Sequence, residues 1–372
     1  MFSKPEIKKY PLGLVRITDD PFICCYLNKS DTTCNTPPSP FSTCEGIFYS
    51  WLVRVSAWIV ALVALVTNLM VLLGRARRKL PNNRKPAENI FLANLAVADI
   101  LMGVYLFAIA IADAWFGADY YRYSQKWRTS PICGAIGVIG IVSSIVSMLD
   151  LTIITIDRFL CIVYPFGNIR FNRKWSKIVC AVIWLAGLAI ALLPIFLKKI
   201  VSNFYGYTDV CLGLPVVRIP RGVAADYKAA GLKYKIKEYS ETEERVTWLY
   251  SSILYTYFGS TCLFVVAVCY ICMFISVLRS RRDSHRPSHG NDEMKLATTI
   301  SVIVGTDMLC WLPIITLSVL SQSGIDIPTK VNPWLVVFVI PINSAMNPFI
   351  YSYGILKRRK KNAPSAIWQG PV

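Results

Sequence analysis

One arginine and two acids in this chain could form a releasable ion pair at the edge of a membrane. Asp157 and Arg158 end one long apolar segment, and Glu293 stands just before another. A charge at the centre of a bilayer costs about 3 kcal/mol, so charges near that depth are usually paired and functional. An arginine shared by acids on two helices could hold those helices together and let them part. The plainer alternative is an interface arginine whose guanidinium reaches out to water.

Three more acids, Asp99, Asp150 and Asp307, fall inside apolar segments. Carboxylates at that depth bind cations, relay protons or hydrogen-bond to neighbouring helices. A proton path through all three would indicate a transporter, but the sequence shows none of the internal repeats typical of many transporters. Asp150 has no evident partner, and either a bound proton or a hydroxyl on a neighbouring helix would satisfy it. The two histidines, His285 and His289, lie in a polar stretch, so the chain is not predicted to be an enzyme.

The segments that carry these residues are long and apolar. Hydrophobic residues make up 54% of the chain and charged residues 17%, which is typical of a membrane protein rather than a soluble domain. A helix needs roughly 20 apolar residues to cross the hydrocarbon core. The expected spans are about 51–73, 90–111, 132–161, 178–197, 248–278, 296–320 and 334–353. The sequence therefore predicts an all-α membrane protein, a seven-transmembrane helix bundle; a large soluble all-α protein is the alternative.

Basic residues set the orientation of this bundle. They gather after the first, third, fifth and seventh spans, so these stretches are expected in the cytoplasm. Residues 1–50 would then form a short, cysteine-containing extracellular tail, residues 51–354 the helical domain and residues 355–372 a short basic cytoplasmic tail. The net charge of +18 reflects this topology and attraction to anionic membrane lipids, and nucleic-acid binding is not expected. Asn28 heads an N-glycosylation motif on the expected outer side.

The cysteines divide between the tail and the spans. Four of them lie in the expected extracellular tail, where disulfides form, and their three alternative pairings stay open. They are Cys24, Cys25, Cys34 and Cys44. A bridge from Cys133, at the start of the third span, to Cys211, in the loop after the fourth, would fasten that loop over the mouth of the bundle.

Characteristic residues recur in nearly every span. They are Asn68 in the first, Asp99 in the second, Cys133 and Asp157-Arg158-Phe159 in the third, Trp184 in the fourth, Tyr270 in the fifth, Cys310-Trp311-Leu312-Pro313 in the sixth and Asn347-Pro348-Phe349-Ile350-Tyr351 in the seventh. In this order the set resembles the rhodopsin-like (class A) G-protein-coupled receptors over residues 51–353. The resemblance implies a receptor of the plasma membrane that passes its signal to a heterotrimeric G protein and requires no cofactor.

Further stretches narrow the resemblance to receptors with leucine-rich repeats. Ala98–Leu106, Cys161–Phe166 and Ile340–Pro348 are similar to the relaxin receptor group, which implies a peptide or protein hormone as ligand. Those receptors capture the hormone with an ectodomain of stacked repeats, and at least three repeats are needed to bury a core. Only 50 residues precede the first expected span, too few for such an ectodomain. A receptor partner that dimerises with full-length receptors without signalling is the alternative.

The resemblance also assigns roles to individual residues. It implies that Arg158 pairs with Asp157 and, across the bundle, with Glu293. Opening this latch would let the sixth helix swing out near Pro313, where a backbone hydrogen bond is missing. Tyr270 and Tyr351 are expected to turn inward and hold the opened state. The expected activation switch comprises Trp311, Pro313, Asp307, Asn343, Asn347 and Pro348.

A sodium pocket around Asp99 is a further implication of the resemblance, with sodium as an allosteric ion. Its expected ligands are Asp99, Ser147, Asn68 and Ser344. Oxygen ligands suit a hard cation, and polar residues that face inward are otherwise expensive in a membrane. The alternative is a hydrated polar network without a specific ion.

Overall fold

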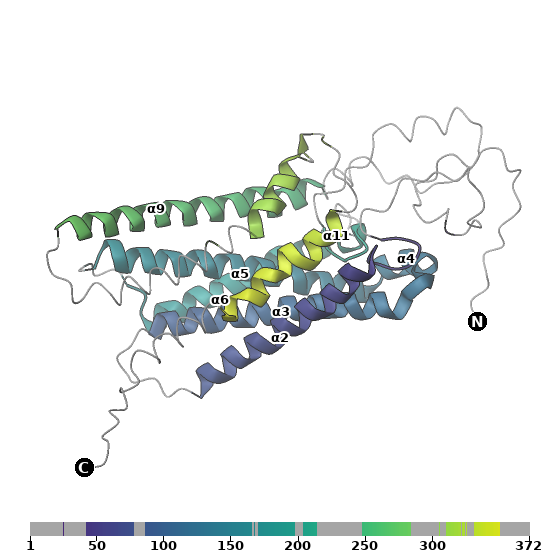
Figure 1. The fold of residues 1–372 in the computed structure, drawn as a ribbon, viewed down its shortest axis with the longest axis horizontal. Helices are drawn as coiled ribbons and strands as arrows, with labels where there is room; N and C mark the ends of the chain where they lie inside the picture. The colour runs from purple at the N-terminus through teal and green to yellow at the C-terminus, as the bar shows by residue number, and fades with distance from the viewer. Residues whose placement is uncertain are drawn as a thin grey trace, which may run out of the picture.

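The structure, a computed structural model, describes most of the helical part of the chain. The described residues are 25, 42–77, 86–165, 167, 170–197, 204–213, 248–283, 305, 310–320, 322–323, 325 and 331–349. Five helices among them are long and apolar enough to cross a membrane. These run side by side in Figure 1 as α2 (Trp51–Ala76), α3 (Pro86–Phe116), α5 (Pro131–Val163), α6 (Arg173–Phe196) and the span Trp248–Arg279, most of which is α9 (Gly259–Asp283).

The two remaining expected spans are described in part. Of the sixth, the structure describes the apolar helix Cys310–Leu320. Of the seventh, it describes α11 (Asn332–Trp334), the π-helical turn η4 (Leu335–Val339) and the helix that continues through residue 349. The prediction of a helical membrane protein is confirmed. Parts of the sixth and seventh expected helices lie outside the described residues, so the number of seven stays a prediction.

The helices begin where a polar side chain caps them. Ser50, Ser130 and Asn172 each accept a hydrogen bond from a backbone amide three residues further on, which satisfies one of the free amides of the first turn. As a result, α6 begins at Arg173 rather than at the predicted residue 178. Hydropathy marks only the apolar part of a helix, whereas the cap marks its start.

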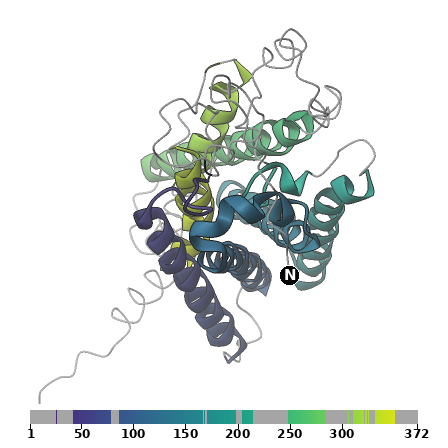
Figure 2. The ribbon, with the colours of Figure 1, turned by 90° about the vertical axis from the view of Figure 1, so that its right-hand side faces the viewer.

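Helix α5 is the centre of the bundle, because it packs against α3, α6 and α9. Figures 1 and 2 show α2 and α9 on opposite sides of it. Its buried face carries many small residues, among them Gly137, Gly140, Ser143 and Ser147. Small side chains let neighbouring helices and loops approach the α5 backbone closely.

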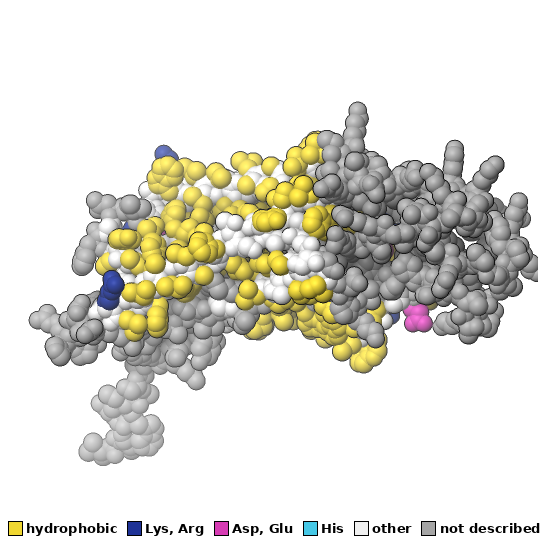
Figure 3. Space-filling model, turned by 90° about the horizontal axis from the view of Figure 1, so that it is seen from above, with side chains coloured by type: hydrophobic (Ala, Val, Ile, Leu, Met, Phe, Trp, Pro, Cys, Tyr) yellow, Lys and Arg dark blue, Asp and Glu magenta, His cyan; other side chains and the backbone are white. Residues whose placement is uncertain are grey.

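The outer surface of the bundle is apolar. Figure 3 shows hydrophobic side chains covering much of the described surface in that view, with basic side chains at one end and an acidic one at the other. Large side chains such as Trp51, Phe264 and Leu185 are about two-thirds exposed or more. In water such a surface would drive association, whereas lipid tails cover it at no cost.

Candidate functional site

Polar side chains gather at three levels of the bundle. The end that holds Cys133 and Cys211 is called the disulfide end below, and the opposite end, which holds Arg158, the arginine end. Between them lies a buried polar layer around Asp99.

At the arginine end, Arg158 lies between two acids. Its Nη2 is 2.9 Å from Oε2 of Glu88 and 3.3 Å from Oδ2 of Asp157. The side chain of Arg158 is only 4% exposed, so these ion pairs are largely shielded from water. The pairing with Asp157 matches the expected geometry, but Glu88, in the first turn of α3, is a partner that sequence reasoning missed. Glu293, the other expected acid, lies outside the described residues.

One of the two tyrosines expected near Arg158 lies among the described residues. Tyr270 lies on α9 and is partly buried, whereas Tyr351 lies outside the described residues. Asp307 of the expected activation switch also lies outside them. The rest of that switch is described: Trp311 and Pro313 are partly buried in the helix Cys310–Leu320, and Asn343, Asn347 and Pro348 are buried near the end of the last helix.

The middle layer joins three helices through one acid. Asp99 of α3 is fully buried and accepts hydrogen bonds from Ser147 Oγ of α5 (3.1 Å) and from Asn347 Nδ2 of the last helix (2.9 Å). Asn68 of α2 donates through Nδ2 to the backbone oxygen of Ser344, 2.8 Å away. The structure thus brings together all four expected sodium ligands with Asn347.

The donor set of this layer fits a hard cation. The side-chain oxygens of Asn68, Asn343 and Asn347 are buried and have no hydrogen-bond partner among the described residues. Buried polar atoms left unpaired are costly, and an ion or ordered water would satisfy them. A carboxylate with surrounding neutral oxygens is the ligand chemistry that sodium and other hard cations prefer.

Asp150 has a hydrogen-bond network of its own, one turn further along α5 than Ser147. Its Oδ2 accepts a hydrogen bond from Asn94 Nδ2 of α3 (2.6 Å), and the Oδ1 of Asn94 accepts one from Trp184 Nε1 of α6 (2.7 Å). The partner of Asp150 is therefore an amide, whereas the sequence left a bound proton or a hydroxyl as alternatives. This chain of bonds ties α3, α5 and α6 together in the membrane interior.

A small cavity lies between the middle layer and the disulfide end. Its lining residues come from α5, from the π-helical turn η3 (Ile253–Phe258) and from the sixth span. They are Ile141, Ser144, Ile145, Met148, Leu254, Tyr255, Phe258 and Trp311. Seven of these eight side chains are apolar or aromatic, and π-helical turns often occur at functional positions. The cavity has a volume of about 10 Å³, which is room for no more than one water molecule.

A disulfide between Cys133 and Cys211 fixes the loop 204–213 across the disulfide end. The loop also bonds to the helices, because Tyr105 of α3 donates to the backbone oxygen of Val210 (2.8 Å) and Tyr205 donates to that of Ala191. Burial raises the pKa of the Tyr205 hydroxyl, so it remains a neutral donor. The loop is thereby seated on the mouth of the bundle.

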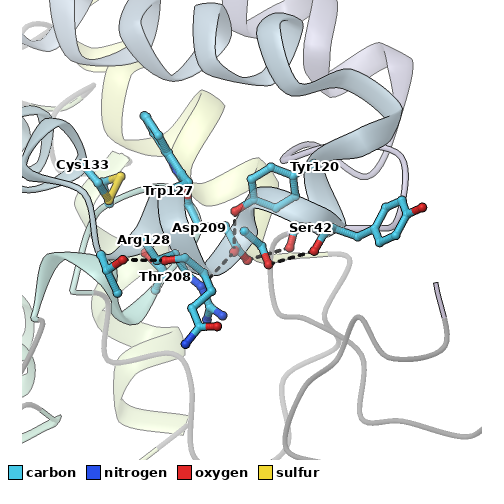
Figure 4. A network of polar contacts seen from close by, with 12 residues as sticks. Ser42, Tyr120, Trp127, Arg128, Cys133, Thr208 and Asp209 are labelled. Carbon is cyan, nitrogen blue, oxygen red and sulfur yellow. Dashed lines mark hydrogen bonds and ion pairs between the residues drawn. A yellow bond between two sulfur atoms is a disulfide. The ribbon is translucent and has the colours of Figure 1, made fainter. Parts of the chain in front are cut away.

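Asp209 of this loop contacts side chains from two other parts of the chain (Figure 4). Its carboxylate accepts hydrogen bonds from Ser42 Oγ (2.6 Å) and from the hydroxyl of Tyr120 (2.7 Å), and Arg128 Nε is 3.7 Å away. Its backbone oxygen accepts from Trp127 Nε1 (2.9 Å). Tyr120 and Arg128 are the first and last residues of α4 (Tyr120–Arg128), a short helix between α3 and α5. One buried acid thus joins the tail, this short helix and the loop.

A second buried acid holds the tail against the helices. Asp113 of α3 pairs with Arg54 of α2 and accepts a hydrogen bond from the backbone amide of Phe48 (3.1 Å). A disulfide joins Cys25 and Cys44, which selects one of the three tail pairings left open by the sequence. Neither Asp113 nor Asp209 was expected at the site. The available signal for Asp113 was an acid two residues beyond the predicted end of the second span at residue 111.

Known proteins match most of this chain. Residues 67–218 and 234–351 match the family described as 7 transmembrane receptor (rhodopsin family). The chain is 32% identical to the G-protein coupled receptor GRL101 of Lymnaea stagnalis over 91% of its own length and 28% of that protein. It is 31% identical to relaxin receptor 1 of Homo sapiens (86% of this chain, 39% of that protein) and 30% identical to relaxin receptor 2 of Homo sapiens (84% and 38%).

The chain therefore spans between about a quarter and two-fifths of the length of these relatives. They are receptors and not enzymes, and the family match covers well over half of the chain. The polar layer around Asp99 and the buried Arg158 lie within the matched residues. The chain belongs to the rhodopsin family of seven-transmembrane receptors.

Proposed function

We propose that this chain forms the seven-helix part of a plasma-membrane receptor for a peptide hormone of the relaxin type and activates a heterotrimeric G protein. The observation that carries the proposal is Arg158, a buried cation held by acids at the arginine end, in a chain of this family. An ion pair of this kind can be exchanged for contacts with an entering protein segment, which is recognition of a helix in a groove. The names of the relatives support the class of hormone.

In this proposal the arginine end faces the cytoplasm and the disulfide end faces outward. Two disulfides, Cys25–Cys44 and Cys133–Cys211, support this orientation, because disulfides form and persist in oxidising compartments. The sixth helix would move outward about Pro313, which lies inside the helix Cys310–Leu320. The movement would open a groove beside Arg158.

The test is nucleotide exchange by purified G proteins with the receptor in lipid nanodiscs. We expect the receptor to accelerate GDP release from one G-protein class without added hormone, since such bundles populate the open state at a low level. Replacing Arg158 by glutamine is expected to abolish this acceleration. The control is Arg122→Gln, an exposed arginine on the short helix α4. Surface display without exchange in any class would favour the non-signalling partner instead.

We also propose that sodium occupies the layer around Asp99. The support is the set of unpaired buried oxygens beside a carboxylate that joins three helices. Sodium at ten times its dissociation constant should stabilise the fold by about 1.4 kcal/mol, which thermal unfolding in sodium and in choline would detect. The Asp99→Asn variant should lose the difference, and Asp119→Asn, at an exposed acid, should keep it. Equal stability of the unaltered receptor in both salts would indicate a hydrated network without a specific ion.

A further inference from the structure

The contact between Arg158 and Glu88 joins two helices that the adjacent Asp157 cannot join. Asp157 lies on the same helix as Arg158, so that pair adds nothing between helices. Glu88 lies on α3, and its Oε2 is the closer of the two acid oxygens, at 2.9 Å against 3.3 Å. Glu88 therefore fixes where the guanidinium points.

The surroundings make this ion pair stronger than a surface one. The side chain of Arg158 is 4% exposed and that of Glu88 is 26% exposed. Exposed pairs contribute little because water and salt screen them, whereas a partly buried pair escapes most of that screening. Removing one partner would leave a buried guanidinium short of an acid.

The position of Glu88 also has a simpler explanation, but that explanation does not account for its contact with Arg158. An acid in the first turn of a helix is favourable because it faces the positive end of the helix dipole. That effect requires no partner on another helix. The next residue, Asn89, is likewise engaged, since its Oδ1 accepts from Arg75 Nη1 of α2 at 2.7 Å. The start of α3 thus receives one arginine from α2 and one from α5.

We propose that Glu88 is a positioning residue that holds Arg158 in the closed arrangement. Resting on the proposed function, the inference is that Arg158 must leave Glu88 before it can contact a G protein. Because Glu88 binds Arg158 from α3, moving the sixth helix alone does not free the arginine. Glu88→Gln should then raise hormone-independent nucleotide exchange by about fivefold or more, the lower end of ordinary allosteric couplings. Glu88→Asp, which keeps the charge, should return exchange most of the way to its original rate.

A double-mutant cycle tests the ion pair without any G protein. Thermal unfolding would be measured for the unaltered receptor, Glu88→Gln, Arg158→Gln and the double variant. We expect Glu88→Gln to lower the unfolding temperature much less in the Arg158→Gln background than in the unaltered receptor, because most of the effect of the Glu88 charge passes through Arg158. Asn89→Ala is the matched control: its effect should add to that of Arg158→Gln, and its exchange rate should equal that of the unaltered receptor.

The two measurements separate the outcomes. Additive shifts for Glu88→Gln and Arg158→Gln would overturn the inference, and so would a coupled cycle with unchanged exchange, since the pair would then only stabilise the fold. Coupled shifts with faster exchange support it. If neither the unaltered receptor nor Glu88→Gln accelerates exchange in any G-protein class, the inference that Glu88 controls signalling fails. A coupled cycle in that case locates the failure in the proposed function rather than in the ion pair.

Discussion

Replacing Gly137 by alanine is expected to lower the free energy of unfolding by about 3 kcal/mol, the upper end of the usual cost of overpacking. A Cβ at this position would lie 2.2 Å from Cδ1 of Tyr205 and 2.3 Å from the backbone oxygen of Cys211. Neither neighbour can retreat easily, because Cys211 is held by its disulfide and Tyr205 by its bond to Ala191. The loop 204–213 would have to move away from α5.

Gly134→Ala supplies the matched control for this experiment. It lies one turn earlier on the same helix, and nothing would come within 4 Å of the added Cβ. Alanine there should be neutral or should stabilise the helix by about 0.5–1 kcal/mol. Thermal unfolding in detergent and the amount of folded protein at the cell surface would compare the two variants. Equal behaviour of Gly137→Ala and Gly134→Ala would contradict the close packing described here.

Loss of the Cys133–Cys211 disulfide is the second change with a large expected effect. Removing the bridge should cost about 2–5 kcal/mol, since it closes a separation of 78 residues. Much of that stretch is helical and stays helical in a membrane even when the bundle is unfolded, which places the cost below the full loop-closure value. Thermal unfolding and surface display are the measurements.

Three variants check that the effect comes from the bridge. Cys133→Ser, Cys211→Ser and the double variant should be equally unstable, because each removes the same bond. Cys272→Ser, at a free cysteine on α9, should change little. A double variant markedly less stable than either single variant would show that the two sulfurs act separately and would contradict the prediction.

Apolar length predicted the helices well, because a span must contain enough apolar residues to cross the membrane. The five membrane-length helices lie within the predicted ranges to a few residues at most ends, and the early start of α6 follows its capping residue Asn172. The π-helical turns η3 and η4 left no sign in hydropathy. Such turns depend on packing between helices, which a single sequence does not display.

The site was harder to predict than the spans. The four residues of the expected ion site, Asp99 among them, came from family resemblance, and the structure places them in one buried polar layer. The partners Glu88, Asn94 and Asp209 were missed, since which polar groups meet depends on helix rotation and loop position. Acids near span ends are common, and the sequence does not tell which of them reaches a partner.

The location of Asp209 sets the order in which this protein can mature. Ser42 is 167 residues upstream of its partner. A ribosome takes roughly 10–30 s to add that many residues, so Ser42 waits through the synthesis of four membrane-length helices before its partner exists. The nearby pair Cys25 and Cys44, only 19 residues apart, can oxidise during this wait. The contact between Ser42 and Asp209 thus marks a chain that has passed this stage of synthesis, and an antibody against the undocked tail would report immature receptor.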